Sequence, residues 1–564
     1  MTTITPQPGN RNTHDPSIPG GPATPGTLTA VPHADQPRTA QKPPAAPPGA
    51  PRPAAARPTP LGELAALLGT DAPATAAQIT GITHDSRAVR PGDVYAALPG
   101  ARLHGADFAT QAAALGAAAI LTDPSGSDRA AATGLPVLTV DDPRGRMGEL
   151  AAEIYGRPGE ALLQIGITGT SGKTTTAYLV EGGLRGAGRT TGLVGTVEMR
   201  IGDERIKSER TTPEATDLQA LFAVMRERGV EAVAMEVSSH ALVLGRVDGC
   251  VFDVAVFNNL SPEHMEFHSD MEDYFQAKAR LFTPARARIG VVNLDDEYGR
   301  RLAKESAIPV VTFSAAGDPA ADWRAVDVTC GHMGSTLTLL GPDGRRVSAT
   351  APLPGPFNVA NTVAAVVTLA TAGLDPQTAA DGVAAVPGVP GRLERVDAGQ
   401  PYLAVVDYAH KTDAVESVLR ALREVTEGRL HIVLGCGGDR DTTKRGPMGA
   451  AAARYADTAV LTSDNPRSED PLKILAAMFE GAASVPPGER GTVIVDADRA
   501  SAIATAVARA GAGDTVLVAG KGHEQGQDTA GVVRPFDDRE VLRAAIAAAT
   551  EKAVHPHDRQ AEVN

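Results

Sequence analysis

The sequence has few cysteines and no long hydrophobic segment. Only three cysteines occur in 564 residues, and they are scattered: Cys250, Cys330 and Cys436. Their number and spacing argue against a disulfide framework and fit a reducing compartment. No apolar run is long enough to span a bilayer, and the first residues do not have the pattern of a signal peptide. The sequence therefore predicts a cytoplasmic protein without membrane insertion.

Positive charge is also scarce. Lysine and arginine number 53 against 67 aspartates and glutamates, which gives a formal net charge of −14. A nucleic-acid binder needs a broad basic face to neutralise phosphates, so this class of function is disfavoured. Any anionic substrate has to be met by local clusters of cations instead.

The length and composition indicate several folded domains followed and preceded by polar segments. A chain of 564 residues with 42% hydrophobic and 21% charged residues is too long for one core. Sixteen of the 43 prolines lie in the first 60 residues, among almost no aliphatic side chains. That segment cannot bury enough surface to order itself, so residues 1–60 are predicted to be a disordered extension. Residues 551–564 are predicted to be a flexible tail.

A phosphate-binding loop is the strongest local signal. The apolar run at 162–167 leads into Gly169-Thr170-Ser171-Gly172-Lys173-Thr174-Thr175 and then into a helical pattern. This order predicts a strand, a glycine-bearing turn and a helix, in which backbone N–H groups and the helix N-terminus bind phosphate. Lys173 would reach the β- and γ-phosphates, and Thr174 would ligate Mg²⁺. The spacing departs from the common motif, because Ile167 stands where its first glycine is usual.

Strands and helices alternate over most of the remaining chain. The rhythm runs to about residue 391 and restarts after Leu393, with strands expected at 403–407, 430–434, 458–462, 493–495 and 516–519. This predicts the α/β fold class, with parallel sheets covered on both faces and a second domain of Rossmann type. Glu236, at the end of an expected strand, would lie at the sheet edge where open α/β folds bind ligands.

Several short motifs follow one another along the chain. They are Asp85-Ser86-Arg87, the loop at 169–176, Thr211-Thr212-Pro213, 235–240, 259–268, Asp407-Tyr408-Ala409-His410, 437–441, Asp464-Asn465-Pro466-Arg467 and 520–524. In this order they resemble the ATP-dependent Mur ligases of peptidoglycan synthesis. The resemblance covers about residues 61 to 550. It implies a UDP-precursor-binding domain at 61–158, a central ATP-binding domain at 159–391 and a C-terminal Rossmann-like domain for the incoming amino acid at 392–550.

The resemblance implies an ATP-dependent amide ligase. A carboxylate of UDP-N-acetylmuramoyl-L-alanyl-D-glutamate would attack the γ-phosphate, and the amine of diaminopimelate would displace phosphate from the resulting acyl phosphate. Since these steps bring anions together, cations must offset their repulsion. The resemblance gives catalytic roles to Lys173, Glu236, His264 and Lys278. It assigns Mg²⁺ to Thr174, Glu236, His264 and Lys278, the last as a carbamylated lysine.

Further ligand contacts follow from the same resemblance. The ATP-binding residues would be Gly169, Thr170, Ser171, Gly172, Lys173, Thr174, Thr175, Asn358, Arg392 and Asp407. The UDP-precursor-binding residues would be Ser86, Thr211, Thr212, Ser238 and Arg246. Neutral hydroxyls and one arginine suit a pyrophosphate and peptide carboxylates without requiring a basic protein. The enzyme is expected to act as a monomer.

The segment at 464–467 bears on the choice of amino acid. Diaminopimelate has a second carboxylate and ammonium at its far end, which require a guanidinium and hydrogen-bond acceptors, respectively. Arg440 and Arg467 would bind the carboxylate, while Asn465, the Gly520 carbonyl and Glu524 would accept from the ammonium. The complete set expected here is Arg440, Asp464, Asn465, Pro466, Arg467, Gly520 and Glu524. Taken alone, the segment also fits an ordinary Asx-Pro turn.

Three other functions remain open from the sequence. They are a Mur-type or folylpolyglutamate-type ligase adding another amino acid, a P-loop NTPase that uses hydrolysis for switching or motion, and a non-catalytic nucleotide-binding partner. Lys278 alone would be a solvated helix lysine, and His264 a loop histidine with local hydrogen bonds. The dependence of phosphate release on the amino acid supplied would separate these functions. The sequence does not distinguish the LL from the meso isomer of diaminopimelate.

Overall fold

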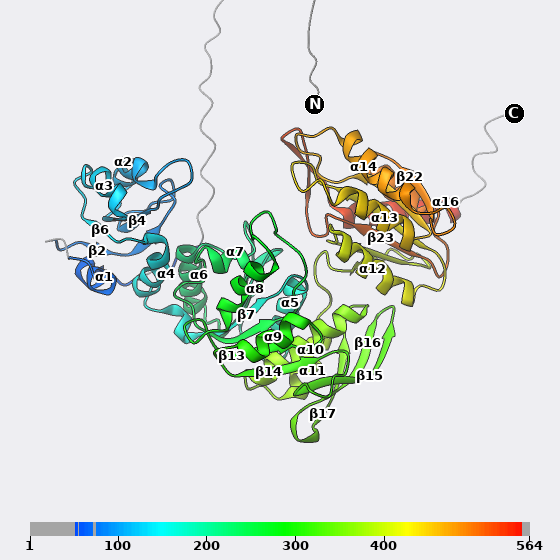
Figure 1. Cartoon of the computed structure of the whole chain (residues 1–564), viewed down its shortest axis with the longest axis horizontal. Coiled ribbons are helices and arrows are strands. Elements are labelled where there is room, and N and C mark those ends of the chain that lie inside the picture. Colours follow the sequence, from blue (N-terminus) through cyan, green and yellow to red (C-terminus); the bar gives the residue numbers. More distant parts are fainter. Residues whose placement is uncertain (1–50, 55, 72–74, 555–564) are drawn as a thin grey trace, which may run out of the picture. The chain divides into compact units, whose positions relative to one another are not determined.

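The computed structural model describes residues 51–54, 56–71 and 75–554, coloured in Figure 1 from blue at the N-terminal end to red at the C-terminal end. No helix in these residues is long and apolar enough to cross a membrane. Most of the predicted extension (residues 1–50) and of the predicted tail (residues 555–564) lies outside the described residues. Helix α16, Asp538–Val554, runs past residue 550, so the tail cannot begin at 551 as predicted.

A four-stranded parallel sheet of order β3-β4-β5-β6 organises the first described part of the chain. Leu64 of α1 and Leu150 of α4 pack on one of its faces, while Ala112 of α2 and Ala130 of α3 pack on the other. The bounds are β1 Thr59–Pro60, α1 Leu61–Leu68, β2 Gln78–Ile79, β3 Gly81–Thr83, β4 Asp93–Ala97, α2 Ala109–Ala114, β5 Ala119–Thr122, α3 Ser127–Ala131, β6 Val137–Thr139 and α4 Pro143–Ile154.

Residues just before α1 belong to the fold, which corrects the predicted extension of residues 1–60. Strand β1 pairs with β2. Arg52 Nη1 lies 2.5 Å from Asp93 Oδ1, and the two side chains are 12% and 2% exposed. Gly81 leaves room for this pair, because a Cβ there would lie 2.7 Å from Arg52 Nη1. Composition reports average burial, so it could not reveal that one arginine with a buried partner fixes this proline-rich stretch.

The central part is built on an eleven-stranded sheet of order β10-β9-β8-β11-β7-β12-β13-β14-β15-β16-β17. Side chains alternate between its faces: Ile165 and Val254 pack with α5, α10 and α11, while Val233 and Phe252 pack with α6, α7, α8 and α9. The bounds are β7 Leu163–Thr168, α5 Lys173–Gly186, β8 Thr191–Val194, β9 Glu198–Ile201, β10 Glu204–Lys207, α6 Ala215–Glu227, β11 Ala232–Glu236, α7 Ser239–Val243, β12 Phe252–Phe257, α8 Met271–Ala279, β13 Ala287–Asn293, α9 Glu297–Glu305, β14 Val310–Ser314, β15 Trp323–Gly331, β16 Gly334–Leu340, β17 Arg346–Ala351, α10 Pro356–Thr371 and α11 Pro376–Ala384.

This sheet is mixed, whereas the sequence predicted only its parallel part. Strands β8, β11, β7, β12, β13, β14 and β15 run parallel. Antiparallel hairpins extend both edges, through β9 and β10 at one and β16 and β17 at the other. In β17 buried and exposed residues alternate strictly, the pattern of a sheet with one solvated face. The hairpins were overlooked because the βα rhythm dominates the sequence on either side of them.

The last part contains a six-stranded sheet of order β18-β19-β23-β20-β21-β22, in which only β18 is antiparallel. Val405 and Ile432 pack with α12, α13 and α14, while Val406 and Val433 pack with α15 and α16. The bounds are β18 Glu394–Arg395, β19 Leu403–Asp407, α12 Thr412–Val425, β20 Leu430–Cys436, α13 Arg445–Tyr455, β21 Thr458–Ser463, α14 Pro471–Ser484, β22 Thr492–Val495, α15 Arg499–Val507, β23 Thr515–Ala519, β24 Gly526–Thr529 and β25 Val532–Pro535, with α16 as given above.

Deleting residues 1–50 is expected to leave the free energy of unfolding unchanged, whereas deleting residues 1–58 should lower it. The longer deletion removes Arg52 and leaves the Asp93 carboxylate buried without its cation, at a cost of about 3 kcal/mol. Urea titration of both truncated proteins measures the difference. In the full chain, Arg52→Ala should reproduce the loss and Arg57→Ala, at an exposed arginine, should not. Equal stability of the two truncated proteins would contradict this account.

Candidate active site

The loop between β7 and α5 has the geometry of a phosphate-binding turn. Gly169 and Gly172 have φ angles of 145° and 85°, which residues with a side chain rarely adopt. Lys173, the first residue of α5, turns back over the loop, and its Nζ donates to the carbonyl oxygens of Gly169 and Thr170 at 2.9 Å each. The lysine and the helix N-terminus therefore place positive charge at the same loop.

Glu236, at the end of β11, holds the hydroxyl next to this lysine. Its Oε1 accepts from Thr174 Oγ1 at 3.0 Å and from the Thr196 N–H at 2.8 Å, and its Oε2 accepts from the Thr196 hydroxyl at 3.1 Å. Arg392 Nη2 donates to Thr174 Oγ1 at 3.3 Å. The structure thus brings Thr174 and Glu236 together. Hydroxyl and carboxylate oxygens are ligands that Mg²⁺ prefers.

Lys278, in α8, is buried against the same loop. Its side chain is 1% exposed, its Nζ donates to Gly169 O at 2.9 Å, and Nζ lies 4.6 Å from the centre of the Tyr274 ring. Burial, and then repulsion from Lys173, lower the pKa of Lys278 well below its usual value. The alternative of a solvated helix lysine is therefore wrong. The lowered pKa favours the neutral amine, which is the nucleophilic form.

His264 follows β12 in a left-handed backbone conformation, with φ of 59°. Its Nε2 lies 3.2 Å from Glu263 Oε1, and its ring centre lies 4.7 Å from that of His240. Burial, and then His264, lower the pKa of His240 to about 4. His268 is a structural residue by contrast, because it is buried with Nε2 3.0 Å from Ser239 Oγ. Of these histidines, His264 lines the cleft described next.

A cleft with a volume of about 700 Å³ is lined by Lys173, Glu236 and His264, whereas Lys278 lies outside its lining. The predicted site residues that line it are Thr170, Ser171, Gly172, Lys173, Thr174, Thr175, Thr211, Glu236, Ser238, His264, Asn358, Arg392 and Asp407. Asp407 is buried, and its carboxylate accepts the N–H groups of Leu393 and Ala409 at 2.7 Å each, so it shapes the turns on both sides. Lys411, which the sequence did not single out, lines the cleft and pairs with Glu263.

Hydrogen bonds from asparagines hold the phosphate-binding loop in place, and the sequence had suggested no role for most of these residues. Asn259 Oδ1 accepts the Ser171 N–H at 2.8 Å, and Asn258 Nδ2 donates to Thr176 Oγ1 at 3.0 Å. Asn361 Nδ2 donates at 3.0 Å to Oδ1 of Asn358, a predicted ATP contact that lies in the first turn of α10. The signal for Asn258 and Asn259 was their place directly after a buried strand, where side chains reach the carboxyl edge of the sheet.

The residues predicted to bind the UDP precursor are only partly brought together. Thr211 and Ser238 line the cleft. Thr212 is buried, and its hydroxyl donates to Glu236 O at 2.9 Å, so it helps to hold the end of β11 in place. Ser86, Thr212 and Arg246 do not line this cleft. Ser86 is 8% exposed and lies in the loop between β3 and β4.

Arg246 belongs to a cluster of cations around one carboxylate. Its Nε donates to Glu214 Oε1 at 2.9 Å, while Arg144 and Arg210 lie 3.3 and 3.8 Å from the same carboxylate. Burial raises the pKa of Glu214, but Arg246 and its other cationic neighbours lower it overall. This is the kind of local cluster that an acidic protein needs for an anionic substrate. Glu214 was missed because nothing in the sequence shows which arginines surround it.

The predicted amino-acid site lies at the carboxyl ends of β21 and β23. Arg467 has φ of 52°, and its Nη1 donates to Gly438 O at 2.6 Å. Gly520 has φ of 113°, and a Cβ there would lie 2.6 Å from Asp464 Oδ2, so only glycine fits. Pro466 is buried and Arg440 is exposed. None of the seven residues predicted for diaminopimelate lines the cleft above.

The predicted role of Asn465 as an acceptor needs correction. Its Oδ1 already accepts the Asp528 N–H at 3.0 Å and Lys521 Nζ at 3.1 Å. Its Nδ2 donates to Glu524 Oε2 at 2.8 Å. The amide therefore offers a ligand an N–H donor, and Glu524 and the Gly520 carbonyl are left as acceptors. The residue could be predicted from the sequence, but the direction of its amide could not, because partners distant in the chain decide it.

A buried ion pair that the sequence did not reveal holds the same two strands. Arg499 and Asp538 are both fully buried, with Nε and Nη2 each 2.7 Å from a carboxylate oxygen. Arg499 also donates to Ser463 O at 3.3 Å and Ala519 O at 2.9 Å. These carbonyls immediately precede Asp464 and Gly520. Arg499 therefore fixes the position of the backbone at the start of both segments predicted to bind diaminopimelate.

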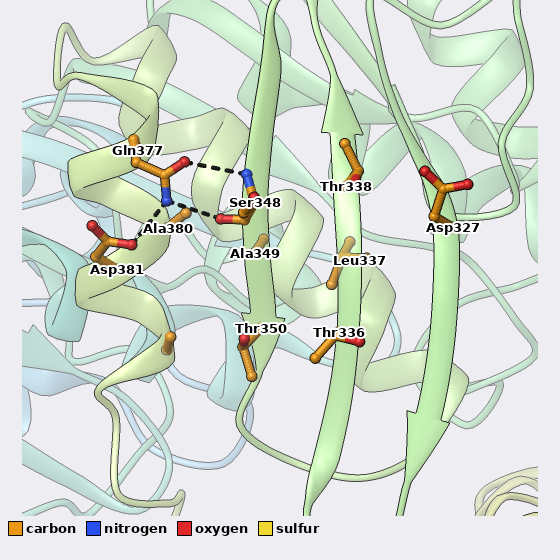
Figure 2. Close-up of a pocket in the computed structure, with 11 residues that line it drawn as sticks. Asp327, Thr336, Leu337, Thr338, Ser348, Ala349, Thr350, Gln377, Ala380 and Asp381 are labelled. Carbon is orange, nitrogen blue, oxygen red and sulfur yellow. Dashed lines mark hydrogen bonds between the residues drawn. The ribbon is translucent and has the colours of Figure 1, made fainter.

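A second hollow, of about 350 Å³, lies on the antiparallel extension of the central sheet (Figure 2). Gln377 of α11 spans its edge, donating from Nε2 to Ser348 O at 3.0 Å and to Asp381 Oδ1 at 2.8 Å. Its wall is formed by β16 and β17 with short side chains such as Thr338 and Thr350. It contains none of the predicted site residues.

Comparisons with known proteins agree on one family. Models of the Mur ligase family match at residues 78–155 (catalytic domain), 167–369 (middle domain) and 391–522 (glutamate ligase domain). A UDP-N-acetylmuramoyl-L-alanyl-D-glutamate–2,6-diaminopimelate ligase of Streptomyces coelicolor is 80% identical over 499 residues, covering 88% of this chain and 98% of the relative. A relative of the same name from Corynebacterium efficiens is 48% identical over 505 residues, covering 86% and 94%.

Solved structures give the same result. A UDP-N-acetylmuramoyl-L-alanyl-D-glutamate–2,6-diaminopimelate ligase superposes with a TM-score of 0.65 at 33% identity, covering 88% of this chain and 100% of that chain. MurF ligase from Thermotoga maritima in complex with ADP superposes with a TM-score of 0.56 at 20% identity, covering 84% and 98%, which shows a likeness of fold alone.

Arg499→Met is expected to lower the free energy of unfolding by about 3 to 5 kcal/mol, because it leaves the Asp538 carboxylate buried without a cation. Changing both partners, with Arg499→Met and Asp538→Leu, should cost less than either single change. A double-mutant cycle from urea unfolding measures this difference. Arg509→Met on an exposed arginine is the matched control. Additive losses in the cycle would contradict the pairing.

Proposed function

The chain belongs to the Mur ligase family, and we propose that it joins diaminopimelate to UDP-N-acetylmuramoyl-L-alanyl-D-glutamate in an ATP-dependent step of peptidoglycan synthesis. The observation that carries the proposal is the 80% identity over 499 residues to a ligase of that name. The cleft supports it, because a glycine-bearing loop, Lys173 and the Glu236 carboxylate line it where nucleotide phosphates would bind, and Lys278 is buried against the same loop. The reaction forms one amide and converts ATP to ADP and phosphate.

In the first step an oxygen of the substrate carboxylate forms a bond to the γ-phosphorus and ADP leaves. Both partners are anions, so the step requires cations placed in advance. Lys173 and Arg392 both line the cleft, where Arg392 donates to the Thr174 hydroxyl, and they would supply these cations. In the second step the neutral amine of diaminopimelate attacks the acyl carbon. The C–N bond forms, phosphate leaves and the amine loses a proton.

We propose that Thr174, Glu236 and His264 take part in holding Mg²⁺. The contact between the Thr174 hydroxyl and the Glu236 carboxylate fits a hard cation. Among residues 51–54, 56–71 and 75–554, no group of three or more His, Cys, Asp or Glu side chains could hold a metal, so phosphate oxygens would complete the coordination. When bound, the ion offsets phosphate charge during transfer.

We also propose that Lys278 is carbamylated. Its neutral amine attacks CO₂, a C–N bond forms and one proton is released, so that an anionic carbamate replaces an ammonium group. The lowered pKa of Lys278 favours the reactive form. A carbamate here would act as an anionic ligand for a second Mg²⁺ and would remove the repulsion with Lys173.

The proposal leaves little room for the other functions considered from the sequence. A hydrolytic switch or a non-catalytic partner would not account for relatives named as ligases that match along most of the chain. We propose that the enzyme works as a monomer in the cytoplasm, where ATP is supplied. Its ligands would be ATP, the UDP-muramyl dipeptide and diaminopimelate.

Product analysis tests the proposed function. With ATP, Mg²⁺ and UDP-N-acetylmuramoyl-L-alanyl-D-glutamate, the protein should release phosphate only when diaminopimelate is added, and mass spectrometry should detect the UDP-linked tripeptide. A panel of other amino acids serves as the comparison. Phosphate release that ignores the amino acid, or a product carrying a different one, would overturn the proposal.

Lys278→Ala is expected to lower kcat on the order of a hundredfold, because it removes an anionic group from the site of phosphoryl transfer. Short carboxylic acids should restore part of the activity by occupying the vacated space. Lys304→Ala, at an exposed lysine in α9, should behave like the parent enzyme. Full activity of Lys278→Ala, together with an unmodified lysine in the liganded enzyme, would refute carbamylation.

Arg467→Ala and Arg467→Lys are expected to lower kcat/KM for diaminopimelate by about tenfold to several hundredfold, because charge-assisted hydrogen bonds to the distal carboxylate are lost. The KM values for ATP and the muramyl precursor should change little. Lysine should become a relatively better substrate for Arg467→Ala. Arg454→Ala, at an exposed arginine of α13, is the matched control. Unchanged discrimination between diaminopimelate and lysine would show that the 464–467 segment is only a turn.

A further inference from the structure

Lys521 is a buried cation among residues assigned to amino-acid recognition. It follows Gly520, the first residue after β23, and is 0% exposed. Its Nζ donates to Asn465 Oδ1 at 3.1 Å and to Glu524 Oε2 at 3.2 Å, and it lies 3.9 Å from Asp464 Oδ1. Burial of an ammonium group is costly unless acceptors surround it. The three residues that surround Lys521 are all among those predicted to bind diaminopimelate.

The neighbours of Asn465 leave its amide only one direction. Its Oδ1 faces the Asp528 N–H and the Lys521 ammonium, both of which can only donate. Its Nδ2 faces a carboxylate oxygen of Glu524, which can only accept. If the amide were flipped, Nδ2 would face the Asp528 N–H and the Lys521 ammonium, and Oδ1 would face the Glu524 carboxylate oxygen. Neither arrangement can form a hydrogen bond. One hydrogen of Nδ2 is used by Glu524, and the other is left for a ligand.

Lys521 also reduces the negative charge of the predicted amino-acid site. Asp464 and Glu524 bring two carboxylates close together, and Lys521 offsets one of them. Without the Lys521 ammonium, the Asp464 and Glu524 carboxylates would repel an incoming carboxylate and attract any cationic side chain more strongly. The same ammonium holds Glu524 by Oε2, which leaves Oε1 for a ligand.

We infer that Lys521 is a positioning residue for the distal end of diaminopimelate, an inference that rests on the proposed function. Lys521 directs Asn465 Nδ2 to donate to the distal carboxylate, together with Arg467, and directs Glu524 to accept from the distal ammonium. An amino acid that has no distal carboxylate leaves these N–H groups desolvated and unpaired. Discrimination against such a substrate follows from that cost.

Lys521→Met tests the inference, because it removes the ammonium and keeps the length of the side chain. The KM for diaminopimelate should rise about tenfold to a hundredfold, and the preference for diaminopimelate over lysine should fall by about tenfold. The KM values for ATP and the muramyl precursor should change less than about twofold. Lys473→Met, at an exposed lysine of α14, is the matched control. A purely structural role would lower activity with all substrates and leave the preference unchanged.

Asn465→Asp provides a second test should Lys521→Met fail to fold. It keeps the shape of the residue and the acceptor for Lys521, but replaces the Nδ2 donor with an oxygen. The KM for diaminopimelate should rise over the same range, and lysine should be affected less. Unchanged KM and preference in the folded variants, in an enzyme that adds diaminopimelate, would overturn the inference. Failure of the unmodified protein to add diaminopimelate would instead overturn the proposed function.

Discussion

Two lysine side chains converge on a single backbone carbonyl in this structure. Lys173 and Lys278 both donate to Gly169 O at 2.9 Å, although one begins α5 and the other lies in the last turn of α8. Burial lowers the pKa of both lysines. At Lys173 the shift is opposed by Glu236 and increased by Arg392, and at Lys278 it is increased by repulsion from Lys173. Anions bound next to the two lysines would offset this concentration of positive charge. The proposed phosphates at Lys173 and the proposed carbamate on Lys278 would each supply one.

The order of the central sheet produces this convergence. Strands β8, β11, β7, β12 and β13 are neighbours and run parallel, so the residues at their carboxyl ends meet at one edge. Glu236, Asn258 and Asn293 lie at these ends, and all three line the cleft with the loop. An acidic protein can thereby bind polyanions through a few fixed cations. The C-terminal sheet has the same arrangement, since Asp464 and Gly520 follow β21 and β23, the two parallel strands on either side of β20.

The sequence was sufficient for the parallel part of the architecture and for the local part of the site. Periodicity located β7 to within a residue or two and placed a helix after the loop, and the loop motif identified Lys173 and Thr174, because these features depend on neighbours in sequence. Features that depend on partners distant in the sequence could not be predicted. Arg499 and Asp538 are 39 positions apart, and neither has a motif that marks it as buried. The direction of the Asn465 amide likewise depends on Lys521 and Asp528, which lie on another segment.

The central claim is that the gathered cations serve phosphoryl transfer to a carboxylate rather than hydrolysis of ATP by water. Oxygen-18 placed in the γ-carboxylate of the D-glutamate residue tests it most directly. During turnover with ATP and diaminopimelate, one labelled oxygen should leave in the released phosphate and the other should remain in the amide carbonyl. Phosphate that carries no label, or that takes its oxygen from labelled water instead, would contradict the account.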